Sequence, residues 1–386
     1  MREPLDMSGT DGKYDAIVVG VGGMGSAAAY HLAHRGQDVL GLERYDIPHT
    51  NGSSHGITRI IRRAYYEHPS YVPLIERAYD LWDGLEEESG RSIIHRTGSI
   101  DAGPPDDPVF EGSLRSCKEH DIPHEVLTSA ELTDRFPGYR LPEGHKALYQ
   151  EDGGFVVPEQ AIVAHTQAAQ AAGAEIHART RVHGWTETPD GGVRVETDRG
   201  SYEANDLVLA AGAWNYKLAD ALDGLAVPER QVLSWFQPTS PALFQPDTFP
   251  VWNLSVPEGR FYGFPVHDVP GMKLGRYHHR DEQIDPDEWE RDPNAEDERV
   301  LREFAERYFP EGTGSTMGLA TCMFTNSPDE HFIIDSLPNH PQVTVAAGFS
   351  GHGFKFASVI GEILADLTVD DETDHPIDMF RLSRFD

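Results

Sequence analysis

The stretch Asp15-Ala-Ile-Val-Val-Gly20-Val-Gly22-Gly-Met-Gly25 decides the fold at the start of this chain. Residues 15–19 form a short apolar run typical of a buried strand. Residues 23–35 have the alanine-rich composition of a helix, which Gly36 ends. A second apolar run follows at residues 38–43. A strand, a helix and a strand in this order form a β-α-β unit, and its right-handed crossover makes the two strands parallel.

The glycines of this unit predict a dinucleotide site. Gly20 permits a tight turn, Gly22 lets the backbone approach a pyrophosphate, and Gly25 lets the helix pack on the sheet. The helix N-terminus then faces the anion, and Glu43 stands where an acid would accept a hydrogen bond from a ribose hydroxyl. A glycine-rich turn without a ligand is the plainer alternative, but the register of strand, helix and acid favours the site. The motif alone does not distinguish NAD from FAD.

The composition narrows the range of partners. The chain has 64 acidic and 32 basic residues, a formal net charge of -32, and only a few of the basic residues are lysine. Such a surface repels phosphates and anionic lipids, so nucleic acid and membrane partners are disfavoured. An acidic, lysine-poor surface also predicts a halophilic protein, because molar salt screens the self-repulsion. An ordinary acidic protein is the alternative.

Cysteine usage and hydropathy bear on the cellular setting. The chain has two cysteines, Cys117 and Cys322, which excludes a disulfide framework and predicts a reducing, cytoplasmic setting. Residues 1–13 lack an apolar core, so no signal peptide is expected there. No run of 18 apolar residues occurs, so no membrane span is expected. No metal site is predicted.

The rest of the chain suggests two domains. Further predicted elements are helices at 71–88 and 158–172, a capping box at Thr128, a hairpin at 193–202 and a strand at 206–211. An antiparallel sheet is expected within 231–275, followed by a solvated surface excursion at 281–300. A strand, a glycine turn and a helix are predicted at 343–347, 348–353 and 354–367. The predicted fold class is α/β (α+β overall). A discontinuous Rossmann-like nucleotide domain takes residues 1–84, 151–218 and 320–386, and a substrate domain with an antiparallel sheet takes residues 85–150 and 219–319.

Four side chains outside the glycine motif are candidates for chemistry. Arg59 and Arg62 are three positions apart, so on a helical turn they would share a face and could recognise a carboxylate or an anionic cofactor group. A pair of solvated surface arginines is the alternative. Lys355 follows a glycine turn at an expected helix start, where the dipole disfavours a cation, so it either holds an anion or is a snorkelling lysine. An isolated cysteine such as Cys322 is more often a small buried hydrophobe than a reactive group.

Taken together, these stretches resemble the monomeric sarcosine oxidase and N-methyltryptophan oxidase family of D-amino-acid-oxidase-like flavoproteins. The resemblance runs nearly end to end. Besides the glycine motif, it covers residues 48–53, 58–62, 262–265, 273–275, 322–335 and 348–356, and residues 380–385 look closer to the N-methyltryptophan oxidase branch.

The resemblance implies FAD in the nucleotide domain, bonded through its 8α-methyl group to Cys322 as a thioether. The implied cofactor-binding residues are Gly20, Gly22, Gly23, Met24, Gly25, Glu43, Arg44, Ser53, Thr58, Arg59, Cys322, Gly351, Gly353 and Lys355. The family pattern Ser-His-His-Gly-Asp-Thr reads Ser53-Ser-His-Gly-Ile-Thr58 here, so Ser54 and Ile57 replace a histidine and an aspartate.

The resemblance also implies catalytic roles. Arg62 and Lys355 would grip the substrate carboxylate, and Lys273 would act through water near flavin N5 to help O2 react. Arg59 would lie against the flavin ring, and the substrate pocket would be lined by Tyr262 and His278. The segment before His278 carries one extra residue relative to the family.

The function that follows is FAD-dependent oxidative demethylation of an N-methyl amino acid, sarcosine or N-methyl-L-tryptophan. Its products would be the amino acid, formaldehyde and H2O2, with O2 as the acceptor, and the enzyme would be a monomer. One alternative is a flavin oxidase of another small amino acid, such as pipecolate, glycine or a D-amino acid. Alternatives from other classes are a nicotinamide-dependent dehydrogenase and a flavin-binding protein without catalysis.

Overall fold

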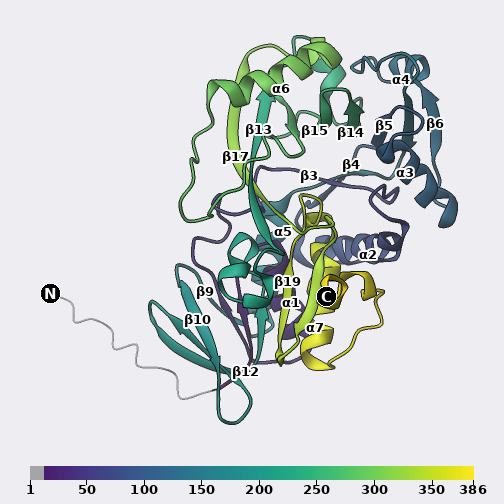
Figure 1. The fold of residues 1–386 in the computed structure, drawn as a ribbon. Coiled ribbons are helices and arrows are strands. Elements are labelled where there is room, and N and C mark those ends of the chain that lie inside the picture. The colour runs from purple at the N-terminus through teal and green to yellow at the C-terminus, as the bar shows by residue number, and fades with distance from the viewer. Residues whose placement is uncertain (1–12) are drawn as a thin grey trace.

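The computed structural model describes residues 13–386, whose strands form three sheets (Figure 1). The first sheet and its helices lie at one end of the molecule, and the second sheet with α6 (Ala295–Tyr308) lies at the other. The prediction that residues 1–13 contain no signal peptide concerns a stretch that lies, except for its last residue, outside the described residues. None of the helices in the described part of the chain is both long and apolar enough to cross a membrane.

The first sheet contains the predicted β-α-β unit. Strand β1 pairs in parallel with β2 and β12, β2 pairs with β9, and β12 pairs with β19. The hairpin β10–β11 and strand β18 extend this parallel core in antiparallel fashion. The strands are β1 (Tyr14–Val19), β2 (Val39–Leu42), β9 (Glu175–His177), β10 (Val182–Glu187), β11 (Val193–Thr197), β12 (Gly200–Leu209), β18 (Ile333–Leu337) and β19 (His340–Ala347).

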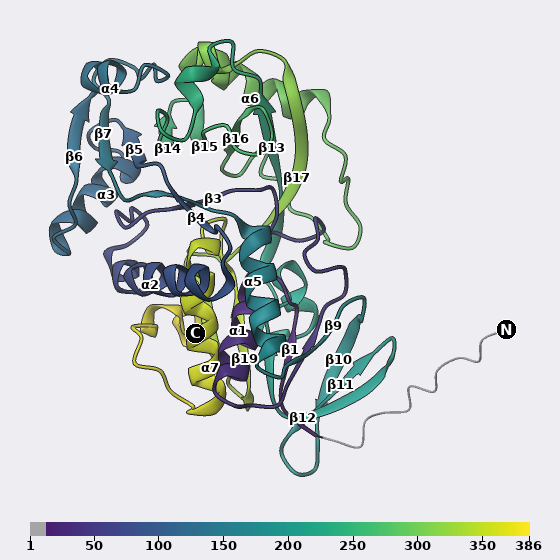
Figure 2. The same cartoon turned by 180° about the vertical axis from the view of Figure 1, so that it is seen from behind.

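Both faces of the first sheet are covered, which explains its uninterrupted apolar strands. Side chains alternate between faces: Ala16 and Val18 pack into the core under the helices, whereas Ile17 and Val19 pack into a second core on the other face. Four helices contact one another on the first face, as Figure 2 shows: α1 (Gly23–His34), α2 (Val72–Ser89), α5 (Pro158–Ala171) and α7 (Ala357–Val369).

The second sheet has the order β17-β13-β16-β15-β14-β5-β7-β6 and is antiparallel except where β14 meets β5. Its strands are β5 (Ser99–Gly103), β6 (Glu125–Thr128), β7 (Lys146–Gln150), β13 (Val227–Phe236), β14 (Val251–Val256), β15 (Gly259–Phe264), β16 (Met272–Arg276) and β17 (Thr316–Asn326). The helices on this side are α3 (Pro108–Glu119), α4 (Ser129–Arg135) and α6 (Ala295–Tyr308). Leu301 and Phe304 bury one face of α6 in the core of this sheet.

A third, three-stranded sheet connects the two ends of the molecule: β3 (Arg59–Ile61), β8 (Gly154–Val156) and β4 (Ile94–Arg96). Short 3-10 helices complete the chain: η1 (Pro69–Tyr71), η2 (Gly212–Lys217), η3 (Asp220–Leu222), η4 (Pro241–Phe244), η5 (Pro310–Gly312), η6 (Phe354–Phe356), η7 (Asp378–Phe380) and η8 (Leu382–Phe385).

Most of the predicted elements are confirmed. The β-α-β unit, the hairpin and the antiparallel central sheet all form, and Thr128 and Glu131 make the predicted capping box. The strands of the first sheet all fall within residues assigned to the nucleotide domain. In contrast, β17 of the second sheet runs across the expected boundary after residue 319. The domain boundaries therefore stay a prediction.

Residues 281–300 lie at the surface as predicted, since nearly all of them are exposed or partly exposed, but the prediction did not include α6, which begins at Ala295 behind a capping box at Asn294. One local prediction is wrong. Arg59 and Arg62 do not share the face of a helical turn, because Arg59 opens strand β3 and Arg62 follows it. In an extended chain, residues three apart point to opposite sides. The two arginines therefore serve different surroundings.

Candidate active site

A large cavity, with about 1650 Å³ of empty space, lies at the carboxyl ends of the parallel strands. Its lining residues follow β1, β2, β12 and β19 directly in the chain, and they include the start of α1. In open parallel sheets, ligands bind at this edge, where the strand ends and a helix N-terminus converge. The position is therefore that of a dinucleotide site.

The glycine turn fits a pyrophosphate. A side chain on Gly25 would lie 1.7 Å from the carbonyl oxygen of Gly20, so helix α1 can approach β1 this closely only with glycine there. Gly20 itself has a φ of +90° and faces the carbonyl of Ala210. A side chain on Gly22, by contrast, would meet nothing within 4 Å. Gly20 and Gly25 thus serve packing, while Gly22 leaves backbone open to a ligand.

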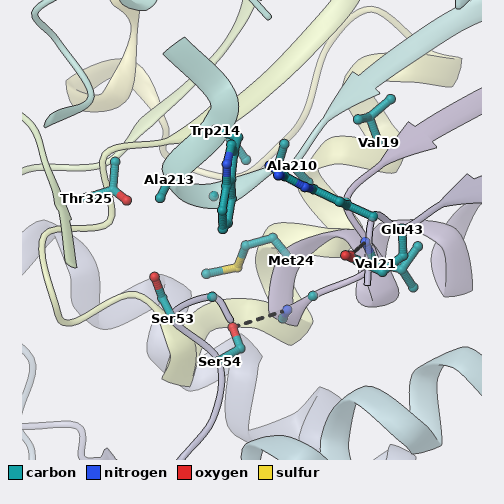
Figure 3. A pocket seen from close by; sticks show the side chains of 18 of the residues that line it. Val19, Val21, Met24, Glu43, Ser53, Ser54, Ala210, Ala213, Trp214 and Thr325 are labelled. Carbon is teal, nitrogen blue, oxygen red and sulfur yellow. Dashed lines mark hydrogen bonds between the residues drawn. The ribbon is translucent and has the colours of Figure 1, made fainter. Parts of the chain in front are cut away.

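Glu43 is buried directly after β2 and binds the backbone of the glycine turn. One carboxylate oxygen accepts a hydrogen bond from the backbone N–H of Val21 at 2.9 Å, and the other accepts from Tyr45 at 2.9 Å. Figure 3 shows this bond to Val21 beside Met24, whose side chain reaches into the cavity. Each carboxylate oxygen can accept a second hydrogen bond, so the bond to a ribose hydroxyl stays a prediction.

Most of the expected cofactor-binding residues line this cavity: Gly20, Gly22, Gly23, Met24, Glu43, Arg44, Ser53, Arg59, Gly351 and Gly353. Gly25, Thr58, Cys322 and Lys355 do not line it. The sequence analysis missed further lining residues, among them His49, Thr180, Trp214, Lys217 and Phe349. Only the topology reveals them, since they follow strands whose neighbours in the sheet come from distant parts of the chain.

The loop before α6 reaches across to the mouth of this cavity. Asp287 accepts hydrogen bonds from Arg44 at 2.5 Å, from Trp214 at 2.9 Å and from Lys217 at 2.8 Å. All three donors line the large cavity. One acidic side chain from the segment expected to be a solvated excursion therefore connects two parts of the cavity wall, Arg44 after β2 and the 3-10 helix η2.

A smaller cavity, with about 410 Å³ of empty space, adjoins the first. Both cavities are lined by Arg59, Phe324, Gly351 and Phe354. The remaining walls of the smaller cavity are formed by Ile60, Tyr262, Phe264, Tyr277, His352 and Lys355. Since these aromatic and cationic side chains come from both ends of the molecule, the smaller cavity is suited to an anionic substrate next to a cofactor.

Cys322 lies on β17 beside the junction of the two cavities and is buried. Its Sγ lies 3.8 Å from the carbonyl oxygen of Ser53 and 3.8 Å from Nη2 of Arg59. Residues two apart on a strand point to the same face, and Phe324 lines both cavities. The thiol is therefore on the cavity side of β17 and contacts residues that line the large cavity.

The loop that carries Arg59 is held by buried polar contacts. Nη2 of Arg59 donates to the carbonyl of Ser53 at 2.6 Å. Glu159 accepts from the backbone N–H groups of Gly56 at 2.7 Å and Ile57 at 3.1 Å. Ile57 has a φ of +75°, a left-handed conformation that costs a β-branched residue energy. The carboxylate of Glu159 stabilises this strained turn.

Lys273 is buried on β16 and reaches the same loop. Its Nζ donates to the carbonyl oxygens of Gly56 at 2.7 Å and Thr58 at 2.8 Å, and to the hydroxyl of Thr58 at 2.9 Å. Three oxygen acceptors match the three N–H donors of an ammonium group. Burial, and next the charge of Arg59, lowers the pKa of Lys273 well below its ordinary value. Its predicted role near a flavin therefore requires one of these bonds to be shared with water.

Arg62 and Lys355 are both buried beside the ring of Tyr65. Asp101 and Glu67 accept hydrogen bonds from Arg62 Nε and Nη2, each at 3.2 Å. The third nitrogen of this guanidinium, Nη1, is buried and has no hydrogen-bond partner in the described chain. A buried donor without a partner calls for an acceptor that the protein does not supply, such as water or an anion.

Lys355 stands at the start of a helical segment as predicted, because it lies in η6, which runs directly into α7. Its Nζ donates to the carbonyl of His352 at 2.8 Å, which leaves further N–H donors on a side chain that lines the smaller cavity. Desolvation by burial, and next the charge of Arg62, lowers its pKa to about 7. A bound anion would favour the charged form.

Of the two expected pocket residues, Tyr262 lines the smaller cavity and His278 lines neither. Tyr277 takes the place in the wall instead. The backbone of His278 is left-handed, with a φ of +50°. Its ring nitrogens contact Glu229 at 2.8 Å and Glu330 at 3.1 Å, away from the cavity.

Within residues 13–386, no group of three or more histidine, cysteine, aspartate or glutamate side chains is arranged to hold a metal ion. The large cavity at the carboxyl ends of the parallel strands is the place where a dinucleotide cofactor could bind. A β-α-β sheet with an open glycine turn, joined to an antiparallel sheet that supplies buried cations, defines a dinucleotide-dependent oxidoreductase.

Comparison with known proteins identifies the family. Residues 15–367 match the FAD dependent oxidoreductase family, and the chain belongs to it. It is 43% identical to a monomeric sarcosine oxidase of Streptomyces avermitilis, with 95% of this chain and 96% of that protein covered. It is 38% identical to an N-methyl-L-tryptophan oxidase of Salmonella arizonae, covering 97% of this chain and 99% of that one.

Solved structures give the same fold. NikD, described as an unusual amino acid oxidase essential for nikkomycin biosynthesis, aligns with a TM-score of 0.83 at 27% identity, covering 96% of this chain and 97% of that chain. An L-proline dehydrogenase from P. horikoshii aligns with a TM-score of 0.81 at 23% identity, covering 97% of this chain and 98% of that one, and shares the fold.

Proposed function

We propose that this enzyme oxidises the N-methyl group of an amino acid of the sarcosine or N-methyltryptophan type. The observation that carries the proposal is the buried, unpartnered Nη1 of Arg62 next to Lys355, beside a cavity that adjoins the dinucleotide site. The full-length similarity to sarcosine and N-methyltryptophan oxidases supports this substrate class. In the net reaction, an N-methyl amino acid, O2 and water give the amino acid, formaldehyde and H2O2.

Residues of the smaller cavity would position the substrate together with Arg62, which lines neither cavity and lies behind Lys355 beside the Tyr65 ring. Arg62, held rigidly by Asp101, and Lys355 would bind the carboxylate through charge-assisted hydrogen bonds. The aromatic side chains of Tyr262 and Phe264 would exclude water around the methyl group. Fixing the amine in one orientation toward the larger cavity supplies much of the rate enhancement by proximity.

The large cavity would hold FAD, because its glycine turn leaves the backbone open at Gly22. Bound FAD supplies the oxidant, accepting a hydride equivalent from the carbon next to the amine and returning the electrons to O2. Lys273 would place positive charge near the site of O2 reduction, where superoxide is stabilised. We propose that the 8α-methyl group is bonded to Cys322, whose sulfur already contacts residues that line the cavity.

The setting of the enzyme is part of the same proposal. Both cysteines are free and buried, which suits a reducing cytoplasm. The acidic, lysine-poor composition suits a protein that works in molar salt. A monomer is proposed because the sarcosine oxidase relatives are monomeric by name.

Product analysis tests the reaction. Purified enzyme is incubated in air with sarcosine, with N-methyltryptophan, and with pipecolate, glycine and D-alanine, and formaldehyde, H2O2 and amino acid are measured. The proposal predicts equal amounts of all three products from at least one N-methyl substrate. Peroxide without formaldehyde, from a cyclic or primary amino acid alone, would contradict it.

A further inference from the structure

Arg260 on β15 is a half-buried cation without a counterion. Among the arginine side chains of residues 13–386, those of Arg181, Arg199 and Arg260 have neither a hydrogen bond nor an ion pair. Arg181 and Arg199 are exposed, so water solvates them. Arg260 is only partly accessible to water, and a desolvated guanidinium normally pairs with an anion.

Arg260 lies next to two residues that form the wall of the smaller cavity. Arg260 and Tyr262 are two residues apart on β15 and therefore project from the same face. Tyr277 lies opposite, with its backbone N–H donating to the carbonyl of Arg260 at 2.9 Å. The guanidinium carbon lies 3.7 Å from the centre of the Tyr277 ring. Tyr262 and Tyr277 both line the smaller cavity, whereas Arg260 lines neither cavity itself and contacts this wall through the Tyr277 ring.

The acids nearest to Arg260 are bound to other cations. Tyr66 and Tyr277 interact most strongly with its guanidinium, and the acids that act on it are Glu67 and Glu330. Glu67 accepts from Arg62 at 3.2 Å, and Glu330 contacts His278 at 3.1 Å. Neither acid forms an ion pair with Arg260. Its in-plane N–H donors therefore stay available, as they do when a guanidinium lies over an aromatic ring.

Arg260 is also close to the expected carboxylate site. The guanidinium carbons of Arg62 and Arg260 lie over the same ring, that of Tyr66, at 4.3 and 5.4 Å from its centre. Both cations therefore contact the same aromatic ring. A substrate held by its α-carboxylate at Arg62 would direct its side chain toward the wall formed by Tyr277 and Arg260.

We propose that Arg260 forms a second anionic subsite, so that the preferred substrates carry an acidic group on the side chain, as in N-methylaspartate and N-methylglutamate. This inference rests on the proposed function and narrows its substrate class. The side-chain carboxylate would contact the edge of the Arg260 guanidinium past the Tyr277 ring. Pairing there would supply the counterion that the protein itself lacks.

The test compares acids with their isosteric amides on the holoenzyme. kcat/KM is measured for N-methylglutamate against N-methylglutamine, and for N-methylaspartate against N-methylasparagine, with sarcosine as the reference. Dissociation constants of glutarate and glutaramate are measured by calorimetry as a readout independent of turnover. Three variants are compared. Arg260→Gln removes the charge, and Arg260→Lys keeps it and serves as a second test should Arg260→Gln fold poorly. Arg199→Gln is the control, because it removes one exposed, unpaired arginine.

Wild type and Arg199→Gln should prefer the acid of at least one pair by about tenfold or more, as for hydrogen bonds to charged groups. Arg260→Gln should lose this preference in both readouts, and Arg260→Lys should keep part of it. Equal use of acid and amide by a wild type that oxidises sarcosine would overturn the inference alone. A preference that survives in Arg260→Gln would overturn the assignment to Arg260. Failure of every N-methyl amino acid would overturn the proposed function and this inference with it.

Discussion

The guanidinium of Arg59 lies 3.8 Å from the sulfur of Cys322, although 263 positions separate the two residues. Strand β3 brings Arg59 to this point from the start of the chain, and β17 brings Cys322 from the far end. Arg59 lines both cavities. The contact therefore joins the third sheet to the second sheet beside both cavities, at the place where a covalent link to the cofactor is expected.

The covalent link predicts a change of mass. The intact wild-type protein should weigh one chain plus one FAD less two hydrogens, and flavin should stay with the protein after acid precipitation. Cys322→Ser should release its flavin under the same conditions. Cys117→Ser serves as the control, because Cys117 is the other buried cysteine and lies in the helical core. Release of flavin from wild type would contradict the thioether.

Substrate binding should weaken as the pH rises, because the pKa of Lys355 is lowered to about 7 by burial. Only the charged lysine binds a carboxylate well, so affinity is greatest below pH 7 and falls above it, by up to about tenfold per pH unit. Methoxyacetate mimics sarcosine without a titrating amine, and its dissociation constant can be measured from pH 6 to 9. Lys355→Met should bind it weakly with no pH dependence in this range. A flat wild-type curve would argue against carboxylate binding by Lys355.

The contacts of Asp287 should secure the cofactor cavity. Asp287→Asn removes charge that Arg44 and Lys217 share, so noncovalent FAD should bind several-fold more weakly, as expected for partly buried ion pairs. The measurement is FAD titration of apoprotein in the Cys322→Ser background. Asp292→Asn is the matched control, since Asp292 lies in the same loop and is exposed. Equal affinities in the two variants would show that the loop does not support the cavity.

His278 should stabilise the fold in a pH-dependent way. Hydrogen bonds to Glu229, and then to Glu330, raise its pKa to about 9. A raised pKa means that the stabilisation is fully present below the unfolded value of about 6.5 and is lost as the pH rises through 9. His278→Gln should lower the free energy of unfolding by about 1–2 kcal/mol at pH 6, after discounting for solvent screening, and by little at pH 9.5. His120→Gln is the control, because His120 is exposed. If the difference in unfolding free energy between wild type and His278→Gln were the same at pH 6 and pH 9.5, the proposed coupling of His278 to the two glutamates would be refuted.

The net charge of -32 predicts that salt stabilises the protein. Self-repulsion of the acidic surface decreases as the Debye length falls to about 3 Å in 1 M salt. Tm should therefore rise steadily as KCl is increased into the molar range. A Tm that stays flat or falls would contradict halophilic adaptation.

The sequence predicted those parts of the site that depend on local physics. The tight turn at Gly20, the close helix approach at Gly25 and the open backbone at Gly22 follow from the spacing of three glycines. The alternation that divides Ala16 from Ile17 between two cores follows from an apolar strand covered on both faces.

Contacts between distant segments could not be predicted. Asp287 looked like one acid among many in a solvated stretch, and only the tertiary fold shows that it binds Arg44. The Arg-x-x-Arg spacing suggested a helical face, whereas pairing of β3 with β8 makes the chain extended there. His278 was expected in the wall of the substrate cavity, whereas the fold places its neighbour Tyr277 there, which the spacing of the motif alone does not resolve.

The most direct test of the central claim is anaerobic reduction of the flavin in molar salt. Purified holoenzyme is mixed with sarcosine, N-methyltryptophan or N-methylglutamate in separate experiments, and its visible absorption is followed. We expect at least one N-methyl amino acid to bleach the flavin, and the flavin absorption to return when air is admitted. Flavin that is bleached by dithionite but by none of these amines would contradict it.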